Sequence, residues 1–148
     1  MKSMLAITMA CLFSLPATTP TLAQGAGIEW DTLNQEALRL LHAGKYDRGV
    51  VVAKKALAVA EQNVGPNHPD VATSLNNLAE LYRAQGQYAQ AEPLYKRSLA
   101  IWEKALGPDH PNVATSLENL ALLYRATKRD KEAKRLEQRA ARIRAIQR

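Results

Sequence analysis

Asparagine and arginine side chains recur at matching places in this sequence and are its candidates for binding chemistry. Asn77 and Asn119 can each donate and accept hydrogen bonds, which suits recognition of a peptide backbone. Arg83 and Arg125 could bind a carboxylate through two parallel hydrogen bonds. Each pair also has a structural interpretation, because the amides could hold adjacent helices together and the arginines could favour the negative end of a helix dipole. Both interpretations stay open at these positions.

Histidine side chains at His68 and His110 are potential metal ligands, but they lie one full repeat apart without cysteine or a dense acidic cluster nearby. The sequence also lacks a recognisable nucleophile motif, a glycine-rich phosphate loop and a paired acid and base. We therefore expect no catalytic residues, no metal and no cofactor, and we interpret the chain as a non-enzymatic protein.

An internal repeat places these residues. Residues 65–106 align with 107–148 without a gap, and about half of the aligned positions are identical, which gives a period of 42 residues. One period earlier, residues 24–64 form a degenerate copy in register, in which Asn34 matches Asn76. Atypical terminal copies are expected because the end faces of a repeat array meet water.

Apolar residues in each copy have helical spacing in two segments. In the second copy, Leu75 and Tyr82 lie on one stripe of a first helix, and Tyr95 and Trp102 lie on one stripe of a second helix. Gly86 supplies the break between them. The composition, rich in Ala and Leu with few aromatic residues, also favours an all-α fold. We predict three antiparallel helix hairpins, stacked because one hairpin cannot cover its own apolar stripe.

The loops between copies share the pattern Gly-Pro-x-His-Pro at residues 65–69 and 107–111. The glycine is expected to end one helix, and the second proline to lie in the first turn of the next, where its missing N–H does no harm. Asp70 and Asn112 follow, and we expect them to help satisfy free N–H groups at the helix start.

Residues of the second copy resemble the signature of the tetratricopeptide repeat (TPR). They are Leu75, Leu78, Ala79, Tyr82, Gly86, Tyr88, Ala91, Tyr95 and Leu99. The 42-residue period and the His-Pro-Asp/Asn-Val-Ala loop resemble the kinesin-light-chain variety of that repeat. The resemblance implies a right-handed α-solenoid whose first helices line a concave groove that binds peptides or partner proteins. It implies no shared chemistry.

Groove positions carried over from the family fall on the first helix of each copy. They are Asn34, Gln35 and Leu38 in the first copy, Thr73, Asn76, Asn77, Glu80 and Arg83 in the second, and Thr115, Glu118, Asn119, Leu122 and Arg125 in the third. The degenerate first copy departs from the family pattern, so the groove could be shallow or need a second molecule through self-association. Asp130 and Glu137 replace Tyr88 and Tyr95 in the third copy, so its last helix is expected to pack less tightly.

Residues 1–23 have the features of a secretory signal peptide, with an early lysine, an apolar run and a small-residue end at Ala23. The apolar run is too short to span a membrane. Cys11 would leave with this segment, and a lipoprotein cleavage box there is a weaker alternative because its usual leucine is missing. We expect a periplasmic or extracellular protein.

The last helix is strongly basic, since residues 128–148 hold nine Lys or Arg against three acidic residues. This helix could attach the protein to an anionic surface such as lipid head groups or nucleic acid, although no specific nucleic-acid recognition is expected. Alternatively, a terminal helix without a successor simply needs a polar outer face. Our leading hypothesis is an exported scaffold that binds a protein or peptide partner in its groove.

Overall fold

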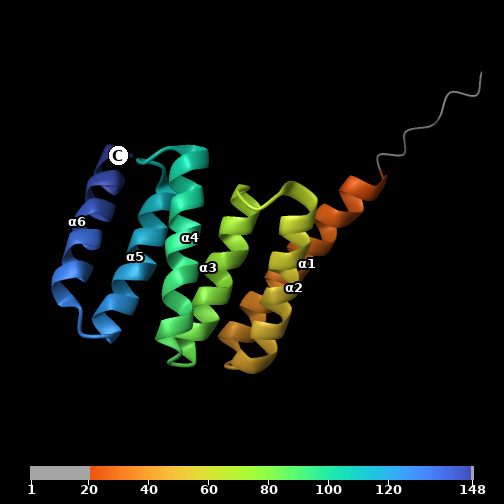
Figure 1. The fold of residues 1–148 in the computed structure, drawn as a ribbon, viewed down its shortest axis with the longest axis horizontal. Coiled ribbons are helices and arrows are strands. Elements are labelled where there is room, and N and C mark those ends of the chain that lie inside the picture. The colour runs from red at the N-terminus through yellow and green to blue at the C-terminus, as the bar shows by residue number, and fades with distance from the viewer. Residues whose placement is uncertain (1–20, 148) are drawn as a thin grey trace, which may run out of the picture.

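Six α-helices account for the secondary structure of residues 21–147, the part of the chain that the computed structural model describes. Successive helices pair into three antiparallel hairpins that stack side by side along one axis (Figure 1). Each hairpin corresponds to one copy of the repeat, so the predicted all-α repeat fold is confirmed. The helices are α1 (Thr21–His42), α2 (Tyr46–Val64), α3 (Pro69–Ala84), α4 (Tyr88–Leu106), α5 (Pro111–Ala126) and α6 (Asp130–Ile146).

The turn inside each hairpin needs one residue in the left-handed region. Gly44 and Gly86 hold this position with φ of 70° and 73°, where glycine has no steric penalty. The third copy has Lys128 there, at φ 60°. The same backbone hydrogen bonds close all three turns. The turn geometry is thus set by the repeat rather than by the residue.

Histidine side chains begin α3 and α5. His68 Nδ1 accepts a hydrogen bond from the backbone N–H of Asp70 at 3.2 Å, and His110 Nδ1 accepts one from Asn112 at 3.1 Å. Each histidine precedes a proline and has the extended backbone that this position favours. The capping side chains are therefore these histidines, and not Asp70 and Asn112 as the sequence led us to expect.

The first helices of the three copies form one layer. α1 contacts α3 and α3 contacts α5, whereas α2, α4 and α6 do not approach one another within the described chain. The copies are therefore closer together on the side of the first helices, which makes that side the concave one. The residues predicted to line the groove belong to this layer of first helices.

Alanine and tyrosine share the core. Ala79 and Ala91 are fully buried where α3 meets α4, and Tyr95 is fully buried in the same cluster. Tyr82 and Tyr88 pack against it from the side. Small residues let the helices approach, and the aromatic rings fill the wider spaces between copies.

The predicted signal peptide lies mostly outside the described residues, which begin at Thr21 in helix α1. Cleavage after Ala23 stays a prediction. None of the helices in the described part of the chain is long and apolar enough to cross a membrane.

Candidate functional site

Asn77, one of the predicted groove amides, lies at the seam between α3 and α1. Its Nδ2 donates to Oδ1 of Asn34 at 3.2 Å, and the Ser74 hydroxyl donates to the same oxygen at 3.4 Å. The indole N–H of Trp30 donates to Ser74 at 2.8 Å. Asn34 and Asn77 are only 5% and 7% exposed, so these bonds satisfy polar groups that burial would otherwise leave unpaired.

Asn119 makes the equivalent contact one copy later. Its Nδ2 donates to Oδ1 of Asn76 at 3.0 Å, which joins α5 to α3. Two amide bridges thus connect the three first helices in register. These asparagines therefore hold adjacent helices together, as their structural interpretation proposes. A binding role would have to use the amide atoms that are not engaged in the bridges.

A polar cavity of about 170 Å³ lies between α3 and α5. Its lining comes from two first helices and one second helix: Thr73, Asn76 and Asn77 of α3, Asn112, Thr115 and Ser116 of α5, and Trp102 of α4. Four of these residues were predicted as groove positions. Trp102, Asn112 and Ser116 were missed, because their approach to the groove depends on how the second and third copies stack.

Residues that line this cavity have unused hydrogen-bonding groups. The amide bridges occupy Oδ1 of Asn76 and Nδ2 of Asn77, while Nδ2 of Asn76, Oδ1 of Asn77 and the Asn112 amide form no side-chain hydrogen bond to a described residue. Donors and acceptors are therefore available beside the ring of Trp102. The volume is below the roughly 300 Å³ of a typical small-molecule pocket, and suits one side chain or a short stretch of backbone.

Glu80 and Arg83, also predicted for the groove, lie further along α3. Arg83 is paired with Glu80 at 3.7 Å and adjoins the buried ring of Tyr95. Burial raises the pKa of Tyr95 to about 12, although the neighbouring Arg83 opposes this shift. Their charges are part of the packing between α3 and α4, and the cavity is not lined by them.

Glu118 and Arg125, two further predicted positions of the third copy, are paired with α6, whereas Leu122 is exposed. Arg144 donates to Glu118 at 3.0 Å and 3.2 Å, and Arg125 binds both carboxylate oxygens of Glu137 at 2.7 Å. Leu122 is 51% exposed. Hydrogen bonds from Arg125 hold the pKa of Glu137 below its usual value. Glu118 and Arg125 are thus occupied within their own hairpin.

Metal binding finds no support in residues 21–147, which contain no group of three or more His, Cys, Asp or Glu side chains placed to hold an ion. His68 and His110 instead cap helices. The sequence analysis left these caps out because a histidine rarely figures among N-cap residues.

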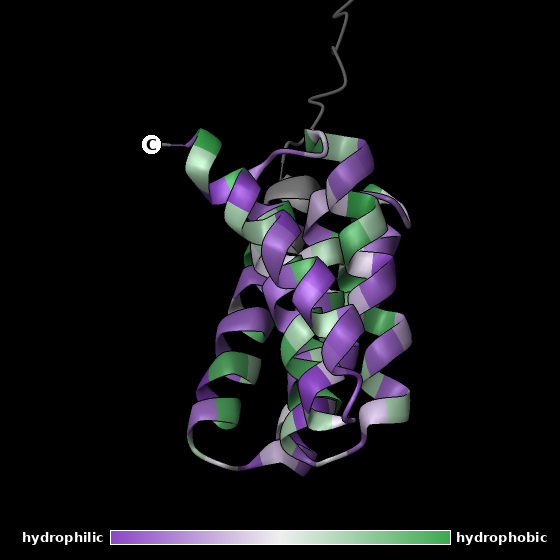
Figure 2. Cartoon of the chain, turned by 90° about the vertical axis from the view of Figure 1, so that its left-hand side faces the viewer, coloured by the Kyte–Doolittle hydropathy of each residue, from purple (hydrophilic) through white to green (hydrophobic). Residues whose placement is uncertain are grey.

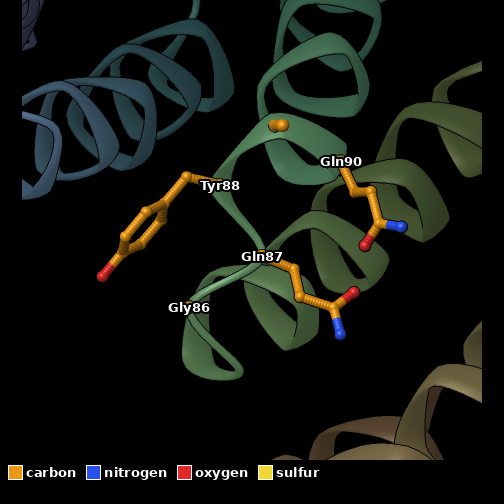
Figure 3. A pocket seen from close by; sticks show the side chains of 5 residues that line it. Gly86, Gln87, Tyr88 and Gln90 are labelled. Atoms are coloured by element: carbon orange, nitrogen blue, oxygen red, sulfur yellow. The ribbon is translucent and has the colours of Figure 1, made fainter.

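A second hollow lies at the turn between α3 and α4, lined by residues 86–90. Figure 3 shows Tyr88 pointing to one side of this turn, and Gln87 and Gln90 to the other. The side chains do not converge on a common point. Of the two hollows, only the cavity between α3 and α5 gathers polar groups from separate helices.

Comparison with known proteins agrees with this architecture. The profile of the tetratricopeptide repeat matches residues 31–101 and 70–145. A solenoid of helix hairpins with bridged first helices is the class that the fold defines, and the chain belongs to the tetratricopeptide repeat family. This fold generally mediates protein–protein interactions, and the family consists of scaffolds that are typically non-catalytic.

Solved structures of kinesin-light-chain type are similar to the chain. A kinesin light chain of Podosopora anserina with nearly identical TPR-like repeats superimposes with a TM-score of 0.71 and 28% identity, over 78% of this chain and 55% of that one. BtubC (BKLC) from P. vanneervenii gives a TM-score of 0.74 and 26% identity, over 84% and 52%. The chain thus spans about half the length of these structures.

Two further similarities are more limited. The TPR domain of Arabidopsis FLU has a TM-score of 0.70 over 81% of this chain and 98% of that one, but at 16% identity it shows the fold alone. The RxLR effector protein SFI4 of Phytophthora infestans is 31% identical over 64 residues, which cover 43% of this chain and 19% of the effector.

Proposed function

We propose that the protein is an exported scaffold that binds an extended segment of a partner protein along its first helices. The polar cavity between α3 and α5 is the centre of the proposed site. The observation that carries this proposal is the convergence of six hydroxyl and amide side chains from two helices beside Trp102. The hollows at residues 86–90, at residues 128–132 and beside Thr32 and Arg39 are each lined by a single copy.

The free amide groups suit a peptide backbone. Asn77 Oδ1 can accept a hydrogen bond from a peptide N–H, while Asn76 Nδ2 can donate to a peptide carbonyl. Their bridges to Asn34 and Asn119 fix both side chains, so little side-chain entropy is lost when a partner binds. Trp102 is only 9% exposed, so it adds a small aromatic surface that one partner side chain can contact.

Export is a separate part of the proposal and rests on the first 23 residues. Expression of the full chain in a bacterium, followed by N-terminal sequencing of the protein from the periplasm or medium, tests it directly. We expect the mature chain to begin at Gln24. Recovery of the chain from the cytoplasm with an intact N-terminus would contradict export, but it would not affect the groove proposal.

Peptide selection tests the groove. Peptides selected from a random display library on the immobilised full chain should lose affinity about tenfold or more when Asn112→Ala and Thr73→Ala are combined, since buried hydrogen bonds to the ligand are lost. Affinity is measured by isothermal titration calorimetry, and folding by circular dichroism. Neither substitution removes a bridge between helices.

A matched control uses Asn67→Ala with Thr32→Ala. Asn67 is an exposed loop residue, and Thr32 makes the same kind of hydrogen bond to its own helix as Thr73, to the carbonyl four residues earlier. This variant should bind the peptides as the natural chain does. Equal losses in the two variants would place the peptides elsewhere and exclude this cavity as the binding site.

A further inference from the structure

Charged residues of α6 are sorted by the direction in which they point. Arg139 and Arg144 of α6, and Arg129 directly before it, form ion pairs with carboxylates, which are Glu92 and Glu132 for Arg129, Glu103 for Arg139 and Glu118 for Arg144. Four other cations, Lys131, Lys134, Arg135 and Arg142, are exposed and have no carboxylate within 4.0 Å among residues 21–147. We call these four residues the α6 crest.

The α6 crest is one continuous strip of surface. At about 100° per residue, Lys131, Arg135 and Arg142 point within roughly 40° of one another and Lys134 lies beside them, and the strip is about 16 Å long. The three acidic residues of the helix, Asp130, Glu132 and Glu137, lie on its flanks and are all paired with arginine. Neutralisation on the flanks leaves the crest purely cationic.

The outer surface of the array carries this strip in the third copy alone. The equivalent positions are Ala89, Glu92, Pro93 and Ala100 in α4, and Asp47, Val50, Val51 and Ala58 in α2. None is a cation. Three of the four in α4 are exposed although α4 has a copy on either side, so these positions face away from the array.

Capping the end of the array does not require the α6 crest. The flank of α6 that a fourth copy would cover holds Glu137 and Arg144, which occupy the places of Tyr95 and Trp102 and are paired with α5. Those residues already make the end polar. Viewed from this end, hydrophilic colouring predominates along the helix that leads to the C-terminus (Figure 2). The outward strip is an additional feature of the surface.

We propose that the α6 crest attaches the protein to an anionic lipid surface. A row of flexible cations without a pocket or fixed partners suits a plane of mobile head groups, which imposes no register. Next to the crest, Ala141 and Ala145 are exposed and Ile146 is 65% exposed, so an apolar side chain lies where it can enter the head-group region. Because the crest lies on the layer opposite the first helices, the groove stays accessible on a bound molecule.

Nucleic acid fits the same surface less well. α6 has no aromatic residue on which a base could stack, and Gln138 is the single amide among the exposed residues of its crest side. A duplex also presents phosphates along curved strands, which a straight row of four cations meets at few points. A preference for lipid is therefore the expectation.

Vesicle sedimentation tests the proposal with the full chain. Vesicles of equimolar phosphatidylglycerol and phosphatidylcholine should bind it, and binding should weaken between about 0.05 M and 0.15 M salt as screening increases. Lys131→Gln, Lys134→Gln, Arg135→Gln and Arg142→Gln together should reduce partitioning by roughly 600-fold, since each of the four cations near such a surface contributes about fivefold. Circular dichroism verifies that the variant is folded.

A charge-matched control separates the crest from total charge. Lys45→Gln, Arg48→Gln, Lys55→Gln and Lys104→Gln remove four exposed cations elsewhere that have no ion pair among the described residues, so both variants have the same net charge. The control should partition within about threefold of the natural chain, because scattered charges reach the surface poorly.

Three results would overturn the proposal: no binding of the natural chain to the anionic vesicles, equal losses in both variants, or crest-variant binding unchanged from the natural chain. A DNA duplex at the same phosphate concentration is the competitor. Tighter binding of the duplex than of the vesicles at about 0.15 M salt would assign the crest to nucleic acid instead. None of these results depends on peptide binding in the groove.

Discussion

The second and third copies of the repeat have almost the same first helix and very different second helices. From Pro69 to Ala84 most residues recur in α5, whereas few residues of α4 recur in α6. The change is sharpest at three positions spaced seven residues apart. Tyr88, Tyr95 and Trp102 in α4 become Asp130, Glu137 and Arg144 in α6.

These positions face the next copy, which explains the difference. Tyr95 and Trp102 are buried in clusters that include residues of α5, which belongs to the following copy. No described helix packs on the far side of α6, and Glu137 and Arg144 instead form ion pairs with α5 of their own hairpin. Identical places in a repeat are thus core in one copy and surface in the other.

Replacing a core residue of the second copy with its counterpart from the third copy should have the largest effect on stability. Tyr95→Glu places in the core between copies the residue that the third copy has at its end. Arg83 adjoins this position, as Arg125 adjoins Glu137, but loss of the buried ring and burial of a carboxylate should still cost about 3–5 kcal/mol of stability or prevent folding. Urea denaturation measures this. Tyr95→Phe is the control and should be within about 1 kcal/mol of the natural chain, because the buried hydroxyl lacks a hydrogen-bond partner among the described residues. Similar losses in both variants would show that the Tyr95 hydroxyl, which both lack, sets the cost, and not the buried charge.

The reverse exchange should change assembly. Asp130→Tyr, Glu137→Tyr and Arg144→Trp together give the third copy the face that α4 presents to α5 and expose three aromatic rings at the end of the array. We expect weak association at about 0.1 mM, because the face is small for a stable interface. Analytical ultracentrifugation measures it, with the natural chain at equal concentration as the control. A monomeric variant would mean that aromatic residues at these positions do not suffice to extend the array.

The amide bridges should differ in strength between the two seams. Asn77→Ala leaves the buried Asn34 without one of its donors and should cost about 1–3 kcal/mol. Asn119→Ala removes a half-buried bridge, where water can replace the lost partner, and should cost about 1 kcal/mol or less. Thermal denaturation of the two variants compares them. An equal or larger loss for Asn119→Ala would contradict the ranking by burial.

The hairpin turn of the third copy should accept the residue that the other two copies have. Lys128 adopts φ 60°, where a side chain is unfavourable, so Lys128→Gly should raise stability by about 1 kcal/mol. Gly86→Lys, at φ 73°, should lower it by a similar amount and serves as the reciprocal test. Urea midpoints measure both. A loss of stability in Lys128→Gly would indicate that the lysine side chain makes a compensating contact.

Acid should weaken the end of the array slightly. Hydrogen bonds from Arg125 lower the pKa of Glu137 in the folded chain below the ordinary value of 4.5, so the stabilisation is present above that pH and is lost as pH falls through the folded pKa. The melting temperature of Glu137→Gln should therefore lie below that of the natural chain at pH 7, and the gap should close as the pH falls below 4.5. Glu29→Gln, at an exposed position in α1, is the control and should show no such gap. A gap that stays constant with pH would exclude the ion pair as its cause.

Much of the fold followed from residue spacing, and less of the site did. Gly86, Ala79 and Tyr95 have the places that a helical repeat predicts, because their local conformation and burial repeat with the period. The cavity was only partly anticipated. Trp102 and Asn112 reach it from different helices, and no spacing within one copy indicates that they meet.

The sequence by itself determined the helices, their hairpin turns and the stacking, since each copy encodes an apolar stripe that a single hairpin cannot bury. Tertiary structure decided which hydrogen-bonding groups remain available. Asn34 and Asn77 form a hydrogen bond between α1 and α3, and Arg125 forms an ion pair with Glu137. Lys131 and Arg135, which the sequence alone does not distinguish from Arg125, are exposed. The reason is physical: a period in the sequence fixes the direction of a side chain, but its partner is set by the neighbouring helix.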